Sequence, residues 1–130
     1  MALERITGEN LLEVGGGLRK FHPSDPDVAL KFVLLGLPSE GGYLRIDRGP
    51  EHIHTLGRLQ GYLAEQGESA HNFIRCGGGF VKIYHQDILR KTRLHFYGES
   101  SVLGKFDKDL LQRVLDESLN KEKFEYHISI

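Results

Sequence analysis

Apolar and polar positions alternate along several stretches of the chain, with the two-residue period of half-buried β-strands. Residues 28–37 form a nearly continuous apolar run that predicts a central strand, and residues 43–47 alternate as its neighbour across a turn would. The same pattern predicts three further strands, the first of them interrupted by Gly77-Gly78-Gly79. They cover residues 71–76 continuing at 80–84, residues 92–97, and residues 124–130.

Two other segments repeat their apolar residues every three to four positions, as amphipathic helices do. The first runs from Pro50, which suits a first helical turn, to about Gln66, and Gly67 suits its C-terminal cap. The second follows Asp107, a suitable N-cap residue. One face of the first helix carries His52, Leu56, Leu59 and Leu63, and one face of the second carries Leu110, Leu111, Val114, Leu115 and Leu119.

In chain order these elements read β-β-α-β-β-α-β. This order predicts an α/β fold, a single mixed β-sheet of about five to six strands packed with two α-helices. A chain of 130 residues has the length of one domain, which we assign to residues 28–130. Residues 1–27 contain three consecutive glycines and a turn-forming stretch at 22–26, so we expect an N-terminal extension that packs on the domain or stays partly mobile.

Charge and composition narrow the classes of partner. The formal net charge of −1 provides no field that would attract nucleic acid. No apolar run approaches the ~20 residues of a membrane helix, and Glu4, Glu9 and Glu13 interrupt any signal-peptide pattern. The single cysteine, Cys76, cannot form an internal disulfide. We therefore expect a cytoplasmic monomer that binds neither nucleic acid nor a membrane.

The seven histidines raise the question of a metal site. His52 and His54 are too close in sequence for the helical pair that binds zinc, and His95 and His127 lie on separate predicted strands. No Cys/His spacing is that of a zinc site. We therefore expect no metal and no cofactor.

Four stretches, in this order, resemble the motifs of one known family. They are the strand lysine within Leu30–Leu35, Arg48-Gly49 ahead of a helix-start histidine, Cys76–Gly79 with its glycine triplet, and the Tyr-Gly-x-Ser-x-x-x-Gly pattern of Tyr97–Gly104. On these motifs residues 28–130 are similar to the janus/ocnus and phosphohistidine phosphatase family. The resemblance implies a metal-independent protein phosphatase. Its partner is a protein that contains phosphohistidine, with phospholysine as a second substrate class.

The resemblance also assigns roles to individual residues. His52 takes the place of the catalytic histidine, and the phosphate-binding positions are Lys31, Ser100, Ser101 and Val102. Helix geometry supports His52, since it shares the sheet-facing side with the leucines and lies where a helix N-terminus attracts anions. Its imidazole would act as a base toward water or as a nucleophile. His54, on the predicted solvent face, is the alternative catalytic residue.

Two positions depart from the family's usual residues. Phe80 follows the glycine triplet where arginine is usual, and Glu99 stands where tyrosine is usual in the serine loop. A carboxylate directed at bound phosphate would repel it. The stretch Gly49–Glu51 is also shorter than its family counterpart. These differences favour the alternative function, a non-catalytic relative that binds a phosphorylated or protein partner.

Overall fold

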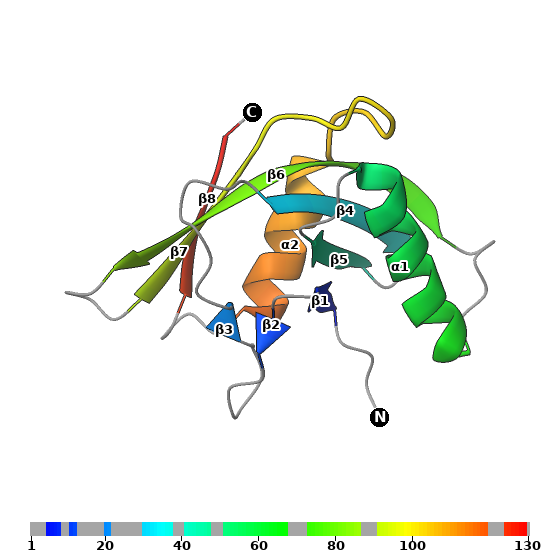
Figure 1. Ribbon diagram of the computed structural model, residues 1–130, viewed down its shortest axis with the longest axis horizontal. Coiled ribbons are helices and arrows are strands. Elements are labelled where there is room, and N and C mark those ends of the chain that lie inside the picture. Colours follow the sequence, from blue (N-terminus) through cyan, green and yellow to red (C-terminus); the bar gives the residue numbers. More distant parts are fainter. Residues whose placement is uncertain are drawn as a thin grey trace.

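One mixed β-sheet runs through the molecule, with one helix on each of its faces (Figure 1). The computed structural model describes residues 5–8, 11–12, 20–21, 30–37, 41–47, 51–67, 73–86, 91–119 and 124–129. In spatial order the six strands are β1 (Ile6–Gly8), β5 (Gly41–Asp47), β4 (Leu30–Leu37), β6 (Ile74–Gln86), β7 (Lys91–Tyr97) and β8 (Phe124–Ile128). The helices are α1 (His52–Glu65) and α2 (Lys108–Ser118), and β2 (Leu11–Leu12) pairs with β3 (Lys20–Phe21). The predicted α/β fold, with one mixed sheet and two helices, is confirmed.

Alternation along β4 divides the interior into two layers. Phe32 and Leu34 face α2, whereas Val33 and Leu35 face α1, and all four side chains are buried. Fully burying one such side chain stabilises a protein by roughly 1.5–3 kcal/mol. The apolar faces predicted for the two helices are the ones that pack on these layers, and His52 is buried together with the leucines of α1.

The inner strands of the sheet pair antiparallel and the two outer strands pair parallel. Antiparallel ladders join β5 to β4, β4 to β6 and β6 to β7, while β1 runs parallel to β5 and β8 runs parallel to β7. Ile6–Gly8 therefore join the sheet, although they belong to the segment expected to be an extension. Much of residues 1–27 lies outside the described residues.

The glycine triplet does not interrupt its strand. Strand β6 is continuous over Ile74–Gln86, and its register with β4 shifts between Val33 and Leu35, which leaves one extra residue on β6. Gly77 has a φ of +87° at this point, a conformation that side chains with a Cβ rarely adopt. The interruption expected at residues 77–79 is therefore wrong, and the strand instead contains a β-bulge beside Gly77.

The helix ends follow the sequence signals in most respects. Asp107 accepts a hydrogen bond from the backbone N–H of Leu110 at 3.1 Å and caps α2 as predicted. Gly67, at φ +85°, follows the end of α1. Helix α1 begins at His52, and Glu51 precedes it without a side-chain capping bond; Pro50 lies outside the described residues. In the part of the chain that is described, neither helix is long and apolar enough to cross a membrane.

Candidate active site

His52 is the first residue of α1, and its ring is turned into the protein. Only 5% of its surface is exposed, and Nε2 lies 2.8 Å from the carbonyl oxygen of Gly79. Because a carbonyl only accepts, Nε2 donates in this bond and carries the proton. In the neutral ring the other nitrogen, Nδ1, therefore holds a free lone pair. The contact with β6 fixes both the tautomer and the direction of the imidazole.

The Phe80 ring packs edge-on against this imidazole. The two ring centroids are 5.2 Å apart and the planes meet at 80°. Such T-shaped contacts are favourable and restrict rotation of both rings. The residue that stands in place of the family's arginine therefore supports the imidazole by packing rather than by charge.

Gly78 is the point at which His52 and Ser100 approach each other. A Cβ built on Gly78 would lie 3.3 Å from His52 Cδ2, 3.5 Å from Ser100 Cβ and 2.6 Å from the carbonyl oxygen of Phe32. Any side chain here would collide with the backbone of β4 and press on both site residues. The glycine therefore allows a strand residue, a helix residue and a loop residue to share one small volume.

Ser100 organises the loop between β7 and α2. It is 2% exposed, and its backbone N–H donates to the carbonyl oxygen of Gly78 at 3.0 Å. Its Oγ accepts hydrogen bonds from the backbone N–H groups of Val102, at 3.2 Å, and Leu103, at 3.0 Å. The hydroxyl proton remains as a donor, because these two bonds use only its lone pairs.

The two loop residues predicted beside Ser100 lie farther out. Ser101 is exposed, and Val102 is 61% exposed at the surface of the loop. The amide of Val102 points back to Ser100 Oγ, whereas the amide of Ser101 has no hydrogen-bond acceptor within the described segments. The structure thus brings Ser100 to His52 and leaves Ser101 and Val102 at the rim.

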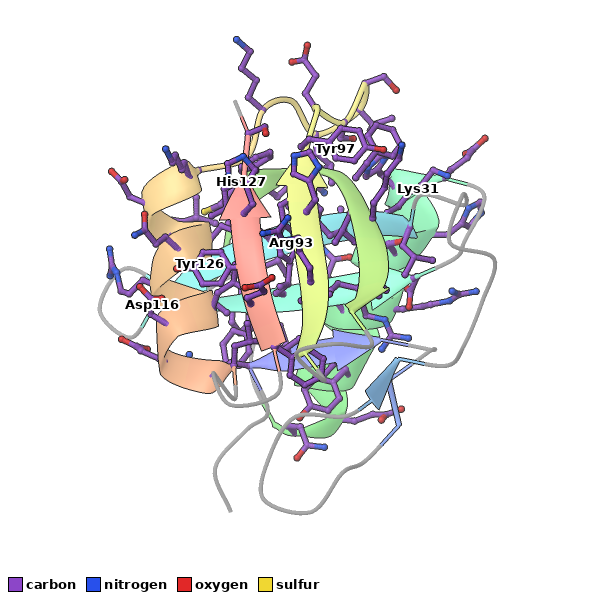
Figure 2. All side chains as sticks on the ribbon, turned by 90° about the vertical axis from the view of Figure 1, so that its left-hand side faces the viewer. Lys31, Arg93, Tyr97, Asp116, Tyr126 and His127 are labelled. Atoms are coloured by element: carbon purple, nitrogen blue, oxygen red, sulfur yellow. The ribbon has the colours of Figure 1, made fainter. Side chains whose placement is uncertain are left out.

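Lys31 reaches the same region from the start of β4. It pairs in register with Phe80 on β6, and its Nζ lies 6.0 Å from the centroid of the Phe80 ring. Phe80 is therefore in contact with His52 on one side and close to the Lys31 amine on the other. Figure 2 shows Lys31 near the same end of the sheet as Tyr97, the residue at which the serine loop begins. His54, the alternative, is exposed on the outer side of α1.

Asp47 is a buried carboxylate that the sequence analysis did not single out. Its side chain is fully buried, and Oδ2 lies 3.0 Å from Arg45 Nε and 3.4 Å from Arg58 Nη1. Arg58 belongs to α1, so this ion-pair group ties the helix to β5. Asp47 also pairs in register with Lys31. The alternation of β5 places Asp47 on a buried face, and this position could have indicated a buried carboxylate from the sequence. Its ion-pair partners could not be predicted, because they meet it only in the folded chain.

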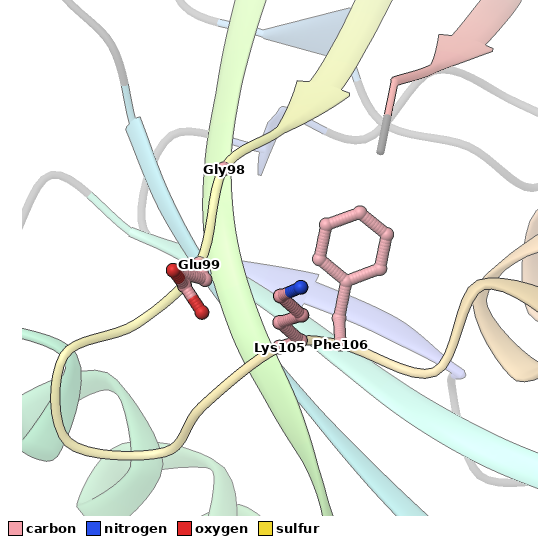
Figure 3. A pocket seen from close by; sticks show the side chains of 4 residues that line it. All are labelled: Gly98, Glu99, Lys105 and Phe106. Carbon is pink, nitrogen blue, oxygen red and sulfur yellow. The ribbon is translucent and has the colours of Figure 1, made fainter.

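Glu99 lies beside a pocket of about 190 Å³ that it lines together with Gly98, Lys105 and Phe106 (Figure 3). The Lys105 amine enters this pocket from the facing segment, so a positive group shares it with the carboxylate. Glu99 is exposed while its neighbour Ser100 is buried. Neither His52 nor Ser100 is among the described residues that line this pocket.

Comparison with known proteins adds no name to this site. No known family model matches the chain, and no curated protein matches it either. Among the described residues, no group of three His, Cys, Asp or Glu side chains is arranged to hold a metal ion. The candidate site thus has a buried imidazole and a buried serine on either side of Gly78, and the Lys31 amine lies near the Phe80 ring that packs on the imidazole.

Proposed function

We propose that this chain is a metal-independent protein phosphohistidine phosphatase of the janus/ocnus type, with phospholysine as a second substrate class. The observation that carries the proposal is the hydrogen bond from His52 Nε2 to the carbonyl oxygen of Gly79, which fixes the ring against β6 and leaves the lone pair of Nδ1 for chemistry. A neutral, oriented imidazole is the group that phosphoryl transfer to or through a histidine requires. The four sequence motifs support the same assignment. The proposal includes a cytoplasmic, monomeric enzyme.

The geometry serves two chemical routes equally. In the first, Nδ1 of His52 attacks phosphorus, the bond from phosphorus to the substrate nitrogen breaks, and the leaving imidazole takes a proton. Water then cleaves phospho-His52 to inorganic phosphate. In the second, Nδ1 accepts a proton from water as the water oxygen attacks phosphorus, the bond from phosphorus to the substrate nitrogen breaks, and His52 then gives the proton to the leaving imidazole. In both routes the ring gains positive character, which strengthens its bond to the Gly79 carbonyl.

Phosphate oxygens need hydrogen-bond donors on the other side of the reaction. The Lys31 amine, the hydroxyl proton of Ser100 and the amide of Ser101 provide them, and such donors lower the barrier by stabilising developing charge. Val102 contributes differently, since its amide holds the Ser100 oxygen in place. Glu99 is exposed and lines, together with Lys105, a pocket to which neither His52 nor Ser100 contributes among the described residues.

Hydrolysis of phosphohistidine by the full chain tests the proposal. We expect the His52→Ala variant to lose at least about 100-fold in kcat/KM, because general acid–base or nucleophilic catalysis is removed. His54→Ala is the matched control and should keep wild-type activity, and a chelator should have no effect. Inorganic phosphate release is measured by 31P NMR, and circular dichroism verifies folding. Equal rates for wild type and His52→Ala would overturn the proposal, and loss only in His54→Ala would move the catalytic role to that residue.

One observation favours the second candidate, a non-catalytic protein that binds a phosphorylated or protein partner. The loop amides of Val102 and Leu103 are already occupied by Ser100 Oγ, and Phe80 supplies no charge beside His52. Wild-type protein that binds a non-hydrolysable phosphonate analogue of phosphohistidine, yet releases no phosphate from the substrate, would establish this candidate instead.

A further inference from the structure

The two halves of the sheet differ in how the face toward α1 is covered. Helix α1 packs on β4 and β5, and the ring of His52 marks the end of its coverage. In the described part of the chain, neither helix packs on the same face of β6, β7 and β8. Figure 1 shows α1 at one side of the sheet and β7 and β8 at the other. The side chains of this open face, identified from the strand register, are Lys31, Phe80, Lys82, Arg93, His95, Tyr97, Glu125 and His127.

A continuous row of rings crosses the open face from the candidate active site to the edge of the sheet. The centroid distances are 5.2 Å from His52 to Phe80, 5.9 Å from Phe80 to Tyr97, and 5.2 Å from Tyr97 to His95. His127 on the edge strand completes the row at 5.2 Å from His95. Phe80, Tyr97 and His95 are half-buried and His127 is exposed. Aromatic side chains of this kind are enriched at protein interfaces.

Cationic groups border this row. Lys31 Nζ lies 6.0 Å from the Phe80 centroid and Lys82 Nζ lies 5.8 Å from the Tyr97 centroid. Arg93 is about half exposed, and its Nε lies 3.1 Å from Glu125, the acidic member of the face. The face is therefore positive within a chain whose net charge is −1.

The pKa of His95 is consistent with a positive surface. Burial lowers this pKa first, and the neighbouring His127, Lys82 and Arg93 lower it further because each disfavours another positive charge. The open face thus combines flat apolar rings with three basic side chains and, among its described residues, one carboxylate, directly beside His52.

We propose that the open face binds an acidic, extended segment of the substrate protein that lies next to the phosphorylated histidine in its sequence. The location of that histidine rests on the proposed function, whereas the binding does not. Neighbouring strands lie about 4.8 Å apart, so the row from β6 to β8 spans about 10 Å, roughly three residues of extended chain. The open face is therefore expected to bind carboxylates of the substrate protein that lie within about five residues of its modified histidine. A nucleic acid fits less well, since the chain as a whole is slightly acidic.

Fluorescence anisotropy with two labelled peptides tests this proposal. Both peptides contain one unmodified histidine, which is followed by glutamates in the first and by glutamines in the second. We expect the glutamate peptide to bind the wild type about 10-fold more tightly, and the difference to shrink as salt is raised. Lys82→Glu should lower the affinity for the glutamate peptide at least about fivefold. Arg113→Glu makes the same change of charge on α2, across the sheet, and should have no effect.

Three outcomes would overturn the proposal. The first is that the wild type binds the two peptides with equal affinity, and the second is that the Lys82 and Arg113 variants weaken binding of the glutamate peptide equally. The third is that a single-stranded oligothymidine binds the wild type more tightly than the glutamate peptide does and loses affinity in Lys82→Gln. That milder variant also replaces Lys82→Glu if the latter fails to fold. Because the readout is binding of peptides without phosphate, failure here is distinct from failure of His52 catalysis.

Discussion

The orientation of His52 depends on residues that have no side chain of their own. Gly79 provides the carbonyl oxygen that holds Nε2, and Gly78 leaves the space in which His52 and Ser100 meet. Each of these contacts uses the backbone of β6, so the geometry is as rigid as the strand itself. The glycine triplet therefore allows the backbone of β6 to pack closely against the His52 ring.

A Gly78→Ala substitution should lower both the stability of the protein and the activity of the candidate site. Its Cβ would lie 2.6 Å from the Phe32 carbonyl oxygen, so β6 or β4 must shift. We expect a loss of about 1–3 kcal/mol in the free energy of unfolding and a loss of phosphatase activity, measured by urea denaturation and phosphate release. Gly61→Ala on α1 is the control, since its Cβ meets nothing within 4 Å and should stabilise by about 0.5–1 kcal/mol. Equal effects of the two substitutions would contradict this account.

The lowered pKa of His95 makes stability depend on pH. Burial first, then the positive charges of His127, Lys82 and Arg93, disfavour its protonated form in the folded state. As the pH falls from about 7 toward 5, the unfolded chain takes up the proton first, at its ordinary pKa of about 6.5, so the folded state loses stability. We expect His95→Gln to flatten this part of the stability curve, followed by urea denaturation at several pH values. A steeper curve in His95→Gln would reverse the assignment.

The elements are held in register by a few tertiary bonds. Asp47 on β5 forms an ion pair with Arg58 on α1. Tyr126 on β8 donates a hydrogen bond to Asp116 on α2, and Figure 2 shows these two side chains next to each other. The second bond joins the edge strand to the helix that precedes it. Burial first, and then this bond and the charge of Asp116, raise the pKa of Tyr126 to about 12. Each helix is thus anchored to one strand by a polar contact as well as by its leucines.

Removing the buried carboxylate should loosen α1 and with it His52. Asp47→Ala leaves Arg45 and Arg58 without their shared partner beneath the helix. We expect a loss of about 3–5 kcal/mol in the free energy of unfolding, the range found when one member of a buried ion pair is removed. Asp109 is an exposed residue of the first turn of α2, and Asp109→Ala should lower the free energy of unfolding by less than about 1 kcal/mol. Thermal and urea denaturation measure both, and similar losses would show that the Asp47 group does not anchor the helix.

Sequence periodicity was sufficient for the elements with long, regular patterns. The sheet-facing side of α1, including His52, and the stripe of α2 both follow from spacing alone. Strand β1 was missed because three residues are too few to show a period, and the continuity of β6 was missed because glycine usually weakens a strand. The contacts of Asp47, and the ring row across β6 to β8, bring together residues that lie far apart in the chain, which no local pattern reports.

The whole molecule is asymmetric about its sheet. Helix α2 packs over the apolar face formed by β5, β4, β6, β7 and β8, whereas α1 shields mainly β4 and β5 on the other side. The candidate active site lies where that shielding ends, because the buried ring of His52 packs against Phe80, the first ring of the open face. The position of the site and the openness of the face therefore have the same cause, which is that α1 covers only part of the sheet.

The parallel pairing of β1 with β5 has a consequence for synthesis on the ribosome. Chain emerges from its N-terminal end, so Ile6–Gly8 leave the tunnel long before Gly41–Asp47, the strand they pair with. The β4–β5 pair can close as soon as both strands emerge, because they are sequential and antiparallel. Strand β1 is thus added to the sheet only after β5, which is made later, has formed the edge that receives it.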